Sequence, residues 1–201
     1  METKSETTGK YERVIKVVVI GPESTGKSSL CTELSKYYST IWCPEYAREY
    51  LLKNGMNYSY DDLLSVARGQ LRKEDEYTGI AGKTTAANDI NNSQPLLFID
   101  TDMYVMKVWC EFVFGSCHQW ILDQIVLRRY DLYLLCNIDL PWQKDELREY
   151  PDLATREKLY HMYRDTMLNQ SVPWVDIRGD YSDRLQTAIR AVDELKSNVL
   201  K

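Results

Sequence analysis

Three features are missing from this sequence: a long apolar run, an excess of basic charge and a paired cysteine motif. No apolar stretch approaches the ~18 residues that span a membrane, and residues 1–13 contain no hydrophobic segment typical of a signal peptide. The formal net charge is −5, and an acidic chain has no general attraction to nucleic acid or to anionic lipid. We therefore expect no membrane and no nucleic acid among its partners.

The cysteines also argue against a disulfide framework. The chain has five of them, Cys31, Cys43, Cys110, Cys117 and Cys136. An odd number without a CxxC pair, partly inside apolar runs, indicates reduced thiols that pack as small hydrophobic groups. A zinc site on Cys110, Cys117 and His118 would lack a fourth ligand and the usual short spacing. The cysteines favour a reducing compartment, so we predict a cytoplasmic protein.

With 44% hydrophobic residues among 201, the chain is able to bury one core, and it contains no repeat or low-complexity linker. Apolar segments predict strands at 14–20, 40–43, 95–100, 131–137 and 172–177. Helical spacing predicts helices at 27–38, 61–77, 104–114, 119–129, 141–169 and from 181 onward. This alternation predicts one α/β domain over 14–201, a three-layer α/β/α fold around a five-stranded parallel sheet, behind a flexible lead-in of residues 1–13.

A glycine-rich loop follows the first predicted strand. Its string GPESTGKS at 21–28 matches the phosphate-loop pattern GxxxxGK[ST], in the strand-to-helix context that the pattern requires. The glycines allow successive N–H groups to point inward and bind anions, while Lys27 would reach the β and γ phosphates and Ser28 would bind Mg²⁺. Glu23 is unexpected beside phosphates, so we expect that it turns to the acceptor or a basic side chain, or faces solvent. The predicted nucleotide-binding residues are Gly21, Glu23, Ser24, Thr25, Gly26, Lys27, Ser28 and Ser29.

Two aspartates follow the third predicted strand in the string LLFIDTD. Asp100 stands where phosphate-loop proteins carry the carboxylate that orients Mg²⁺ or its waters, and Asp102 shares its side of an extended chain. Asp102 would then accept the proton of an attacking hydroxyl, and the alternative is that it only caps the following helix. Residue 101 is not the water-activating glutamate of many motor ATPases, and neither [NT]KxD nor LSGGQ occurs. These absences favour an ATP-using kinase of a small molecule.

Charged residues further along the chain are candidates for the acceptor side and for a lid. Glu45 and Arg48 lie three residues apart after the second strand, where one helical turn places them on one face to bind a sugar hydroxyl. The alternative is an ordinary surface pair. Arg148 and Arg156 lie in the charged segment 141–169, which we interpret as a helical lid that brings arginines to the transferring phosphate, or alternatively as a solvated face.

The motifs, in their order along the chain, resemble the ribosylnicotinamide kinase domain of the NadR family. The resemblance extends from about Val14 over nearly the whole chain and rests on the strings GPESTGKSSL, EYAREY, ARGQ, FIDTD, WQKDELR and VPWVDI. It implies a P-loop kinase fold of the nucleoside-kinase type, with a lid that carries Arg148 and Arg156. It further implies ATP-dependent phosphorylation of the 5′-hydroxyl of nicotinamide riboside to nicotinamide mononucleotide, a step of NAD salvage.

Two differences from the family affect what the resemblance implies. About a dozen residues precede the first predicted strand, so we do not expect the adenylyltransferase domain or the DNA-binding region of longer members. Where the family kinase often has tryptophan before the Glu-Tyr pair, this chain has Pro44. Trp42, Trp109 or Trp142 would then supply the ring that stacks on the cationic pyridinium.

These observations lead to one hypothesis with two rivals. ATP and Mg²⁺ bind at residues 21–29, and a ribonucleoside lies over Glu45, Arg48 and Asp102 with its 5′-hydroxyl in line with the γ-phosphate. We favour Asp102 over Glu45 as the base. The rivals are a kinase of another nucleoside or deoxynucleoside, and a non-catalytic regulator that senses ATP or NAD. The sequence assigns neither an oligomeric state nor a preference for ATP over GTP.

Overall fold

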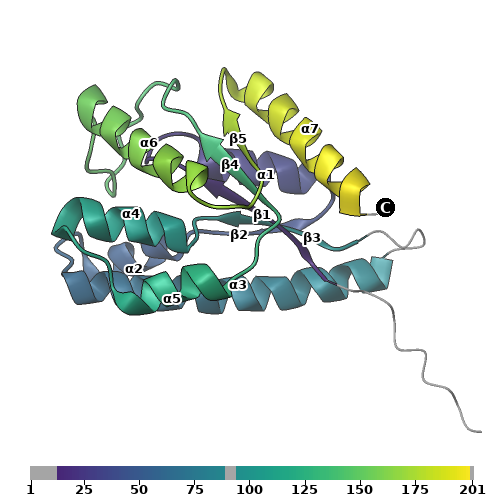
Figure 1. The fold of residues 1–201 in the computed structure, drawn as a ribbon, viewed down its shortest axis with the longest axis horizontal. Coiled ribbons are helices and arrows are strands. Elements are labelled where there is room, and N and C mark those ends of the chain that lie inside the picture. The colour runs from purple at the N-terminus through teal and green to yellow at the C-terminus, as the bar shows by residue number, and fades with distance from the viewer. Residues whose placement is uncertain (1–12, 89–93, 200–201) are drawn as a thin grey trace, which may run out of the picture.

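The computed structural model describes residues 13–88 and 94–199 (Figure 1). Its strands are β1 Ile15–Ile20, β2 Ile41–Cys43, β3 Leu96–Asp100, β4 Leu132–Cys136 and β5 Trp174–Ile177. Its helices are α1 Lys27–Tyr37, α2 Tyr46–Asn54, α3 Tyr60–Asn88, α4 Met103–Phe114, α5 Gln119–Leu127, α6 Leu153–Leu168 and α7 Tyr181–Val199. The predicted lead-in, residues 1–13, lies outside the described residues except for its last residue.

The strands form one parallel sheet in the order β2-β3-β1-β4-β5. On one face, α1 and α7 contribute Leu34 and Val192 to the core cluster that contains Val17. On the other face, α3, α4 and α6 pack around Val18, with Val105 among the buried side chains. The remaining helices, α2 and α5, pack against α3 and α4. The sheet therefore lies between two helical layers, as Figure 1 shows, and the predicted fold class is confirmed.

Local sequence signals place the ends of the elements well. Each observed strand lies inside a predicted segment, since fully apolar runs between turn residues favour buried parallel strands. Ser59 and Asp62 form the reciprocal bonds of a capping box at the start of α3, with Ser59 N donating to Asp62 Oδ2 at 2.8 Å. Asp180 caps α7 by accepting from the N–H groups of Ser182 and Asp183. One difference is that α3 continues to Asn88, well beyond the predicted end at 77.

The predicted helix at 141–169 is only partly correct. Residues 153–168 form α6, capped by Asp152, whereas residues 141–152 form an irregular loop with one turn. Pro141 and Pro151 explain the difference, because proline lacks an N–H and disfavours helical geometry in the residue before it. The helix itself buries Leu159 and Tyr163 in the core beneath the sheet. We call residues 141–152 the covering loop.

Two further expectations from the sequence concern membrane-spanning helices and the cysteines. Within residues 13–88 and 94–199, no helix is long and apolar enough to cross a membrane. All five cysteines are free thiols, four of them buried and Cys117 half-buried. The interpretation of the cysteines as packing residues is confirmed for those four.

Candidate active site

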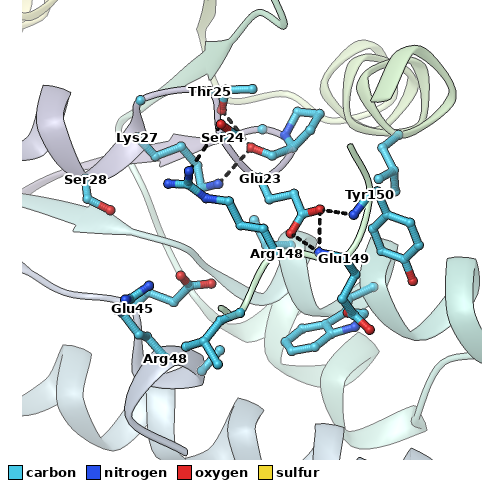
Figure 2. Close-up of a pocket in the computed structure, with 18 of the residues that line it drawn as sticks. Glu23, Ser24, Thr25, Lys27, Ser28, Glu45, Arg48, Arg148, Glu149 and Tyr150 are labelled. Atoms are coloured by element: carbon cyan, nitrogen blue, oxygen red, sulfur yellow. Dashed lines mark hydrogen bonds between the residues drawn. The ribbon is translucent and has the colours of Figure 1, made fainter. Parts of the chain in front are cut away.

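The carboxyl ends of neighbouring strands meet at one cavity. The phosphate loop follows β1, Glu45 follows β2, and the covering loop follows β4 after a short turn. All three segments line the cavity, together with side chains of α4 and α6. In Figure 2, Glu45 and Arg48 lie across the cavity from Lys27 and Ser24. The edge where ligands of parallel sheets bind therefore brings the phosphate loop, Glu45 and Arg48 to one cavity.

The phosphate loop has the backbone geometry of an anion site. Gly21 has φ 137°, and a Cβ there would lie 2.6 Å from the main-chain oxygen of Cys136. Gly26 has φ 78° and is the N-cap of α1, so it offers no side chain to the first N–H groups of the helix. With no acidic residue in the first turn of α1, those N–H groups and the helix dipole favour a bound phosphate.

Side chains of the loop itself and one from α7 hold the loop in this shape. Thr25 Oγ1 and Lys27 Nζ both donate to the main-chain oxygen of Pro22, at 2.7 and 3.0 Å. The buried guanidinium of Arg184 donates to the main-chain oxygens of Thr25 and Asn137, each at 2.9 Å. The sequence reasoning missed Arg184, because an arginine on an amphipathic helix looks like a surface residue until its carbonyl partners are placed. It ties the phosphate loop to the end of β4.

The structure brings Ser28 and Asp100, the two residues expected to bind Mg²⁺, into contact. Ser28 Oγ donates to Asp100 Oδ2 at 2.5 Å. Asp100 is buried, and its Oδ1 has no hydrogen-bond partner in the part of the chain that the structure describes. Burial, with the nearby charge of Glu45, raises the pKa of this carboxyl. A hydroxyl beside an unpartnered buried carboxylate oxygen fits Mg²⁺, which takes oxygen ligands and commonly binds one or two carboxylates in company with phosphates.

Asp102 is not where the prediction requires it. It is the N-cap of α4, and its Oδ1 accepts from the N–H groups of Tyr104 and Val105 at 3.0 and 3.3 Å. Its Oδ2 accepts from the hydroxyl of Tyr133 at 2.8 Å, and the residue does not line the cavity. Burial raises the pKa of Asp102 to about 7. The geometry agrees with the capping alternative and leaves no oxygen directed at an acceptor.

Glu45, unlike Asp102, lines the cavity. It occupies the N-cap position of α2 but makes no capping bond with its side chain. Thr101 Oγ1 donates to Glu45 Oε1 at 3.5 Å. Thr101 has φ 80°, a strained backbone for a β-branched residue, directly after Asp100. Strain of this kind concentrates at functional sites, and here it lies between the two carboxylates.

The string ARGQ explains how Glu45 is positioned relative to Asp100. Gln70 is buried in α3; its Oε1 accepts from the N–H of Tyr46 at 2.7 Å, and its Nε2 donates to the main-chain oxygen of Thr101 at 3.0 Å. One amide thus joins the start of α2 to the end of β3. Gly69 permits the close approach, because a Cβ there would lie 1.9 Å from the ring of Tyr46. The string alone assigned no role to Gln70 or Gly69, because neither contact is visible before α2 and α3 are placed side by side.

Glu23 turns toward the covering loop instead of the phosphate cradle, as Figure 2 shows. Its carboxylate accepts from the N–H of Glu149 at 3.0 Å and from that of Tyr150 at 2.5 Å. Burial raises the pKa of this carboxyl, although the two N–H groups and Lys27 act to lower it. Ser24, with φ 58°, accepts from the N–H of Gln143 at 2.9 Å. Two residues of the phosphate loop thus bind the covering loop.

Of the predicted arginines, the structure brings two to the cavity and leaves one outside. Arg148 lines it and donates to Ser24 Oγ at 3.3 Å. Arg48 also lines it, but it pairs with Asp145 of the covering loop at 3.1 Å and makes no bond to Glu45. Arg156 is buried, donates to main-chain oxygens at positions 138 and 140, and does not line the cavity. Its predicted contact with a transferring phosphate is not supported.

Four aromatic side chains, from α4, the covering loop and α6, line the cavity together with aliphatic ones, and we call these four the aromatic wall. Of the three tryptophans considered from the sequence, Trp109 lines it. Trp42 packs instead against the core beneath α1 and α7, and Trp142 lies over the Arg156 guanidinium at 5.6 Å. The other aromatic lining residues are Phe112, Tyr150 and Tyr163. These rings provide flat apolar surface in the same cavity as Glu45 and Arg48.

Replacing Gln70 tests how strongly the site is braced. Gln70→Met removes both bonds while nearly conserving volume, and it leaves the Tyr46 N–H buried without a partner. We expect a loss of about 1–3 kcal/mol in the free energy of unfolding, measured with urea. Gln186→Met, on the exposed side of α7, is the matched control and should stay within about 0.5 kcal/mol of wild type. Equal stability of the two variants would contradict the bracing role.

Comparison with known proteins places this geometry in a family. A family model described as an AAA domain matches residues 16–184. The trifunctional NAD biosynthesis/regulator protein NadR of Salmonella typhimurium is 26% identical over 184 residues, which cover 89% of this chain and 42% of that protein. NadR of Escherichia coli is 25% identical over the same shares. The chain therefore spans about two-fifths of the length of the curated relatives it matches.

Solved structures share the fold. NadR in complex with NR superposes with a TM-score of 0.70 at 22% identity, covering 92% of this chain and 50% of that one. NadR with NAD and AMP-PNP gives a TM-score of 0.62 at 22% identity and also covers 92% of this chain and 50% of that one. Thymidylate kinase from Ehrlichia chaffeensis gives 0.63 at 11% identity, covering 90% and 99%. The resemblance to NadR is confirmed, and the match of the family model to most of the chain shows that the protein belongs to this AAA-domain family of P-loop proteins.

Proposed function

We propose that the chain is an ATP-dependent kinase that phosphorylates the 5′-hydroxyl of nicotinamide riboside to give nicotinamide mononucleotide. The observation that carries the proposal is the placement of Glu45 opposite the phosphate loop in one cavity with an aromatic wall. Two similar NadR structures, one with NR and one with NAD and AMP-PNP, support the proposal of a nucleoside acceptor and of a nucleotide donor.

The donor side of the cavity is the phosphate loop. N–H groups at the start of α1 would hold the β and γ phosphates, and Lys27 would exchange its bond to the Pro22 oxygen for a bond to phosphate. Ser28 and Asp100 would hold Mg²⁺. When bound, Mg²⁺ supplies charge neutralisation between the phosphates. The chain's own contribution is a fixed set of donors that need no rearrangement as charge develops.

The acceptor side is formed by Glu45, Arg48 and the aromatic wall. Glu45 would accept the proton of the 5′-hydroxyl as the oxygen attacks the γ-phosphorus, because its carboxylate lines the cavity without a capping bond. Arg48 would bind a ribose hydroxyl while paired with Asp145. Trp109 offers a ring face for the cationic pyridinium.

The covering loop completes the site from above. Arg148 lies beside Ser24 of the phosphate loop, where its guanidinium would stabilise the negative charge of the transferring group. The loop lies over both walls and would exclude water, which otherwise competes with the nucleoside as acceptor.

A second candidate is a kinase that acts on another nucleoside or deoxynucleoside. The shared fold with a thymidylate kinase over 99% of that chain favours it. Because aromatic walls bind many bases, the identity of the acceptor depends on how much the pyridinium charge adds.

An acceptor panel with ATP and Mg²⁺ tests the proposal. We expect ADP release with nicotinamide riboside at a kcat/KM about tenfold above that with uridine, adenosine or thymidine, the factor given by about 1.4 kcal/mol of cation–π attraction. Lys27→Ala, purified in the same way, is the control and should release no ADP above background. Preference for another nucleoside would establish the second candidate. Nucleotide binding without acceptor-dependent ADP release would indicate a regulator.

Two substitutions distinguish the carboxylates. Glu45→Gln should lower kcat by about 10²–10⁴-fold, because the amide accepts no proton. Asp102→Asn should keep kcat within about threefold of wild type, since asparagine caps helices as well as aspartate does. Initial rates at saturating ATP measure both. A folded Asp102→Asn protein that loses as much activity as Glu45→Gln would return the role of base to Asp102.

A further inference from the structure

A line of hydrogen bonds connects the aromatic wall to the phosphate loop. Trp109 Nε1 donates to the hydroxyl of Tyr58 at 2.9 Å. That hydroxyl donates to Glu149 Oε2 at 2.8 Å. The N–H of Glu149 then donates to the carboxylate of Glu23 at 3.0 Å. Four residues from four separate segments of the chain are thus linked one after another.

The two ends of this line belong to different segments of the cavity lining. Trp109 belongs to the proposed acceptor side, formed by Glu45, Arg48 and the aromatic wall, which we call the acceptor wall. Glu23 belongs to the phosphate loop, and both residues line the cavity. Tyr58, in the connection between α2 and α3, lies behind Trp109 and does not line it. The line therefore connects the two ligand sites without passing through the reacting atoms.

Glu149 is bonded at both of its ends, which makes it the central member. Its main chain binds the phosphate loop and its side chain binds Tyr58. A movement of this residue away from Glu23 therefore disturbs the hydroxyl that Trp109 contacts. The next residue acts in parallel, because the Tyr150 N–H also binds Glu23 while its ring packs edge-on against Phe112 at 5.2 Å.

We propose that Tyr58 and Glu149 are positioning residues that couple occupation of the acceptor wall to the hold of the covering loop on the phosphate loop. The inference rests on the proposed function for the identity of the two ligands. A nucleoside that fixes Trp109 fixes Tyr58 and Glu149, and so keeps Glu23 turned away from the phosphates. By thermodynamic linkage, bound nucleotide must then raise the affinity for the nucleoside by the same factor as bound nucleoside raises the affinity for the nucleotide.

Affinity measurements test the coupling. The Kd of Mg-AMP-PNP, measured by calorimetry, should fall about fivefold when nicotinamide riboside is saturating. We call the Kd without the nucleoside divided by the Kd with it the coupling ratio. A value at the lower end of typical coupling is expected because Glu149 is exposed. Tyr58→Phe should reduce the coupling ratio to about one. It keeps the edge-on ring packing on Trp109 at 5.1 Å and loses only the hydroxyl. Tyr50→Phe, which removes a hydroxyl bonded to Asp62 outside the line, should keep the wild-type ratio.

Substitutions of Glu149 provide an internal control. Glu149→Gln retains an oxygen that accepts from Tyr58 and should keep the ratio. Glu149→Ala retains the N–H bonded to Glu23 but loses the side chain, and its ratio should fall to about one. A wild-type ratio of one in a chain that phosphorylates nicotinamide riboside, or a Tyr58→Phe ratio equal to that of wild type, would overturn the proposal.

A measurement without any nucleoside separates this inference from the proposed function. Mg-AMP-PNP alone should change the fluorescence of Trp109, read as the difference between wild type and Trp109→Phe. The change should be absent in Tyr58→Phe and present in Tyr50→Phe. If this pattern holds while nicotinamide riboside is not phosphorylated, the proposed function fails and the coupling stands. If nicotinamide riboside is phosphorylated but Tyr58→Phe responds like wild type, the coupling fails and the function stands.

Discussion

The close approach of two neighbouring strand ends determines the rest of the site. Gly21 leaves β1 where a Cβ would collide with the main-chain oxygen of Cys136 at the end of β4. Only glycine tolerates both this distance and the positive φ, so the loop turns sharply and its N–H groups face one centre. Arg184 then fixes the loop from the other side by binding the Thr25 oxygen. An anion site made of main chain is thereby rigid before any ligand arrives.

The acceptor wall is built on the same sheet edge but by a different kind of bond. A single buried amide, that of Gln70, joins the start of α2 to the end of β3 and so sets Glu45 beside Asp100. The covering loop is bound to both walls, to Glu23 on the donor side and to Arg48 on the acceptor side. The exposed ion pair is weakened by salt, whereas the bonds from Glu23 to main-chain N–H groups constrain geometry.

The parts that could be predicted from the sequence are those encoded by local pattern. Apolar runs predicted the strands, and a fixed spacing of glycine, lysine and serine predicted the loop. The sequence assigned Ser28 and Asp100 separately to Mg²⁺, and the bond between them appears only in the structure. Sequence spacing could not separate a cap from a base at Asp102, because both roles follow a strand end. Nor could it find the partner of Arg48, since Asp145 is 97 positions away in the chain.

The central claim is that the phosphate loop delivers a phosphoryl group to a hydroxyl held beside Glu45 in the same cavity. The direct measurement is to incubate the purified chain with Mg²⁺, nicotinamide riboside and ATP labelled in its γ-phosphate, and to follow the label. We predict that the label appears as a 5′-phosphate ester of the nucleoside, in amounts equal to the ADP formed. Label found only in inorganic phosphate, or remaining in ATP, would contradict the account.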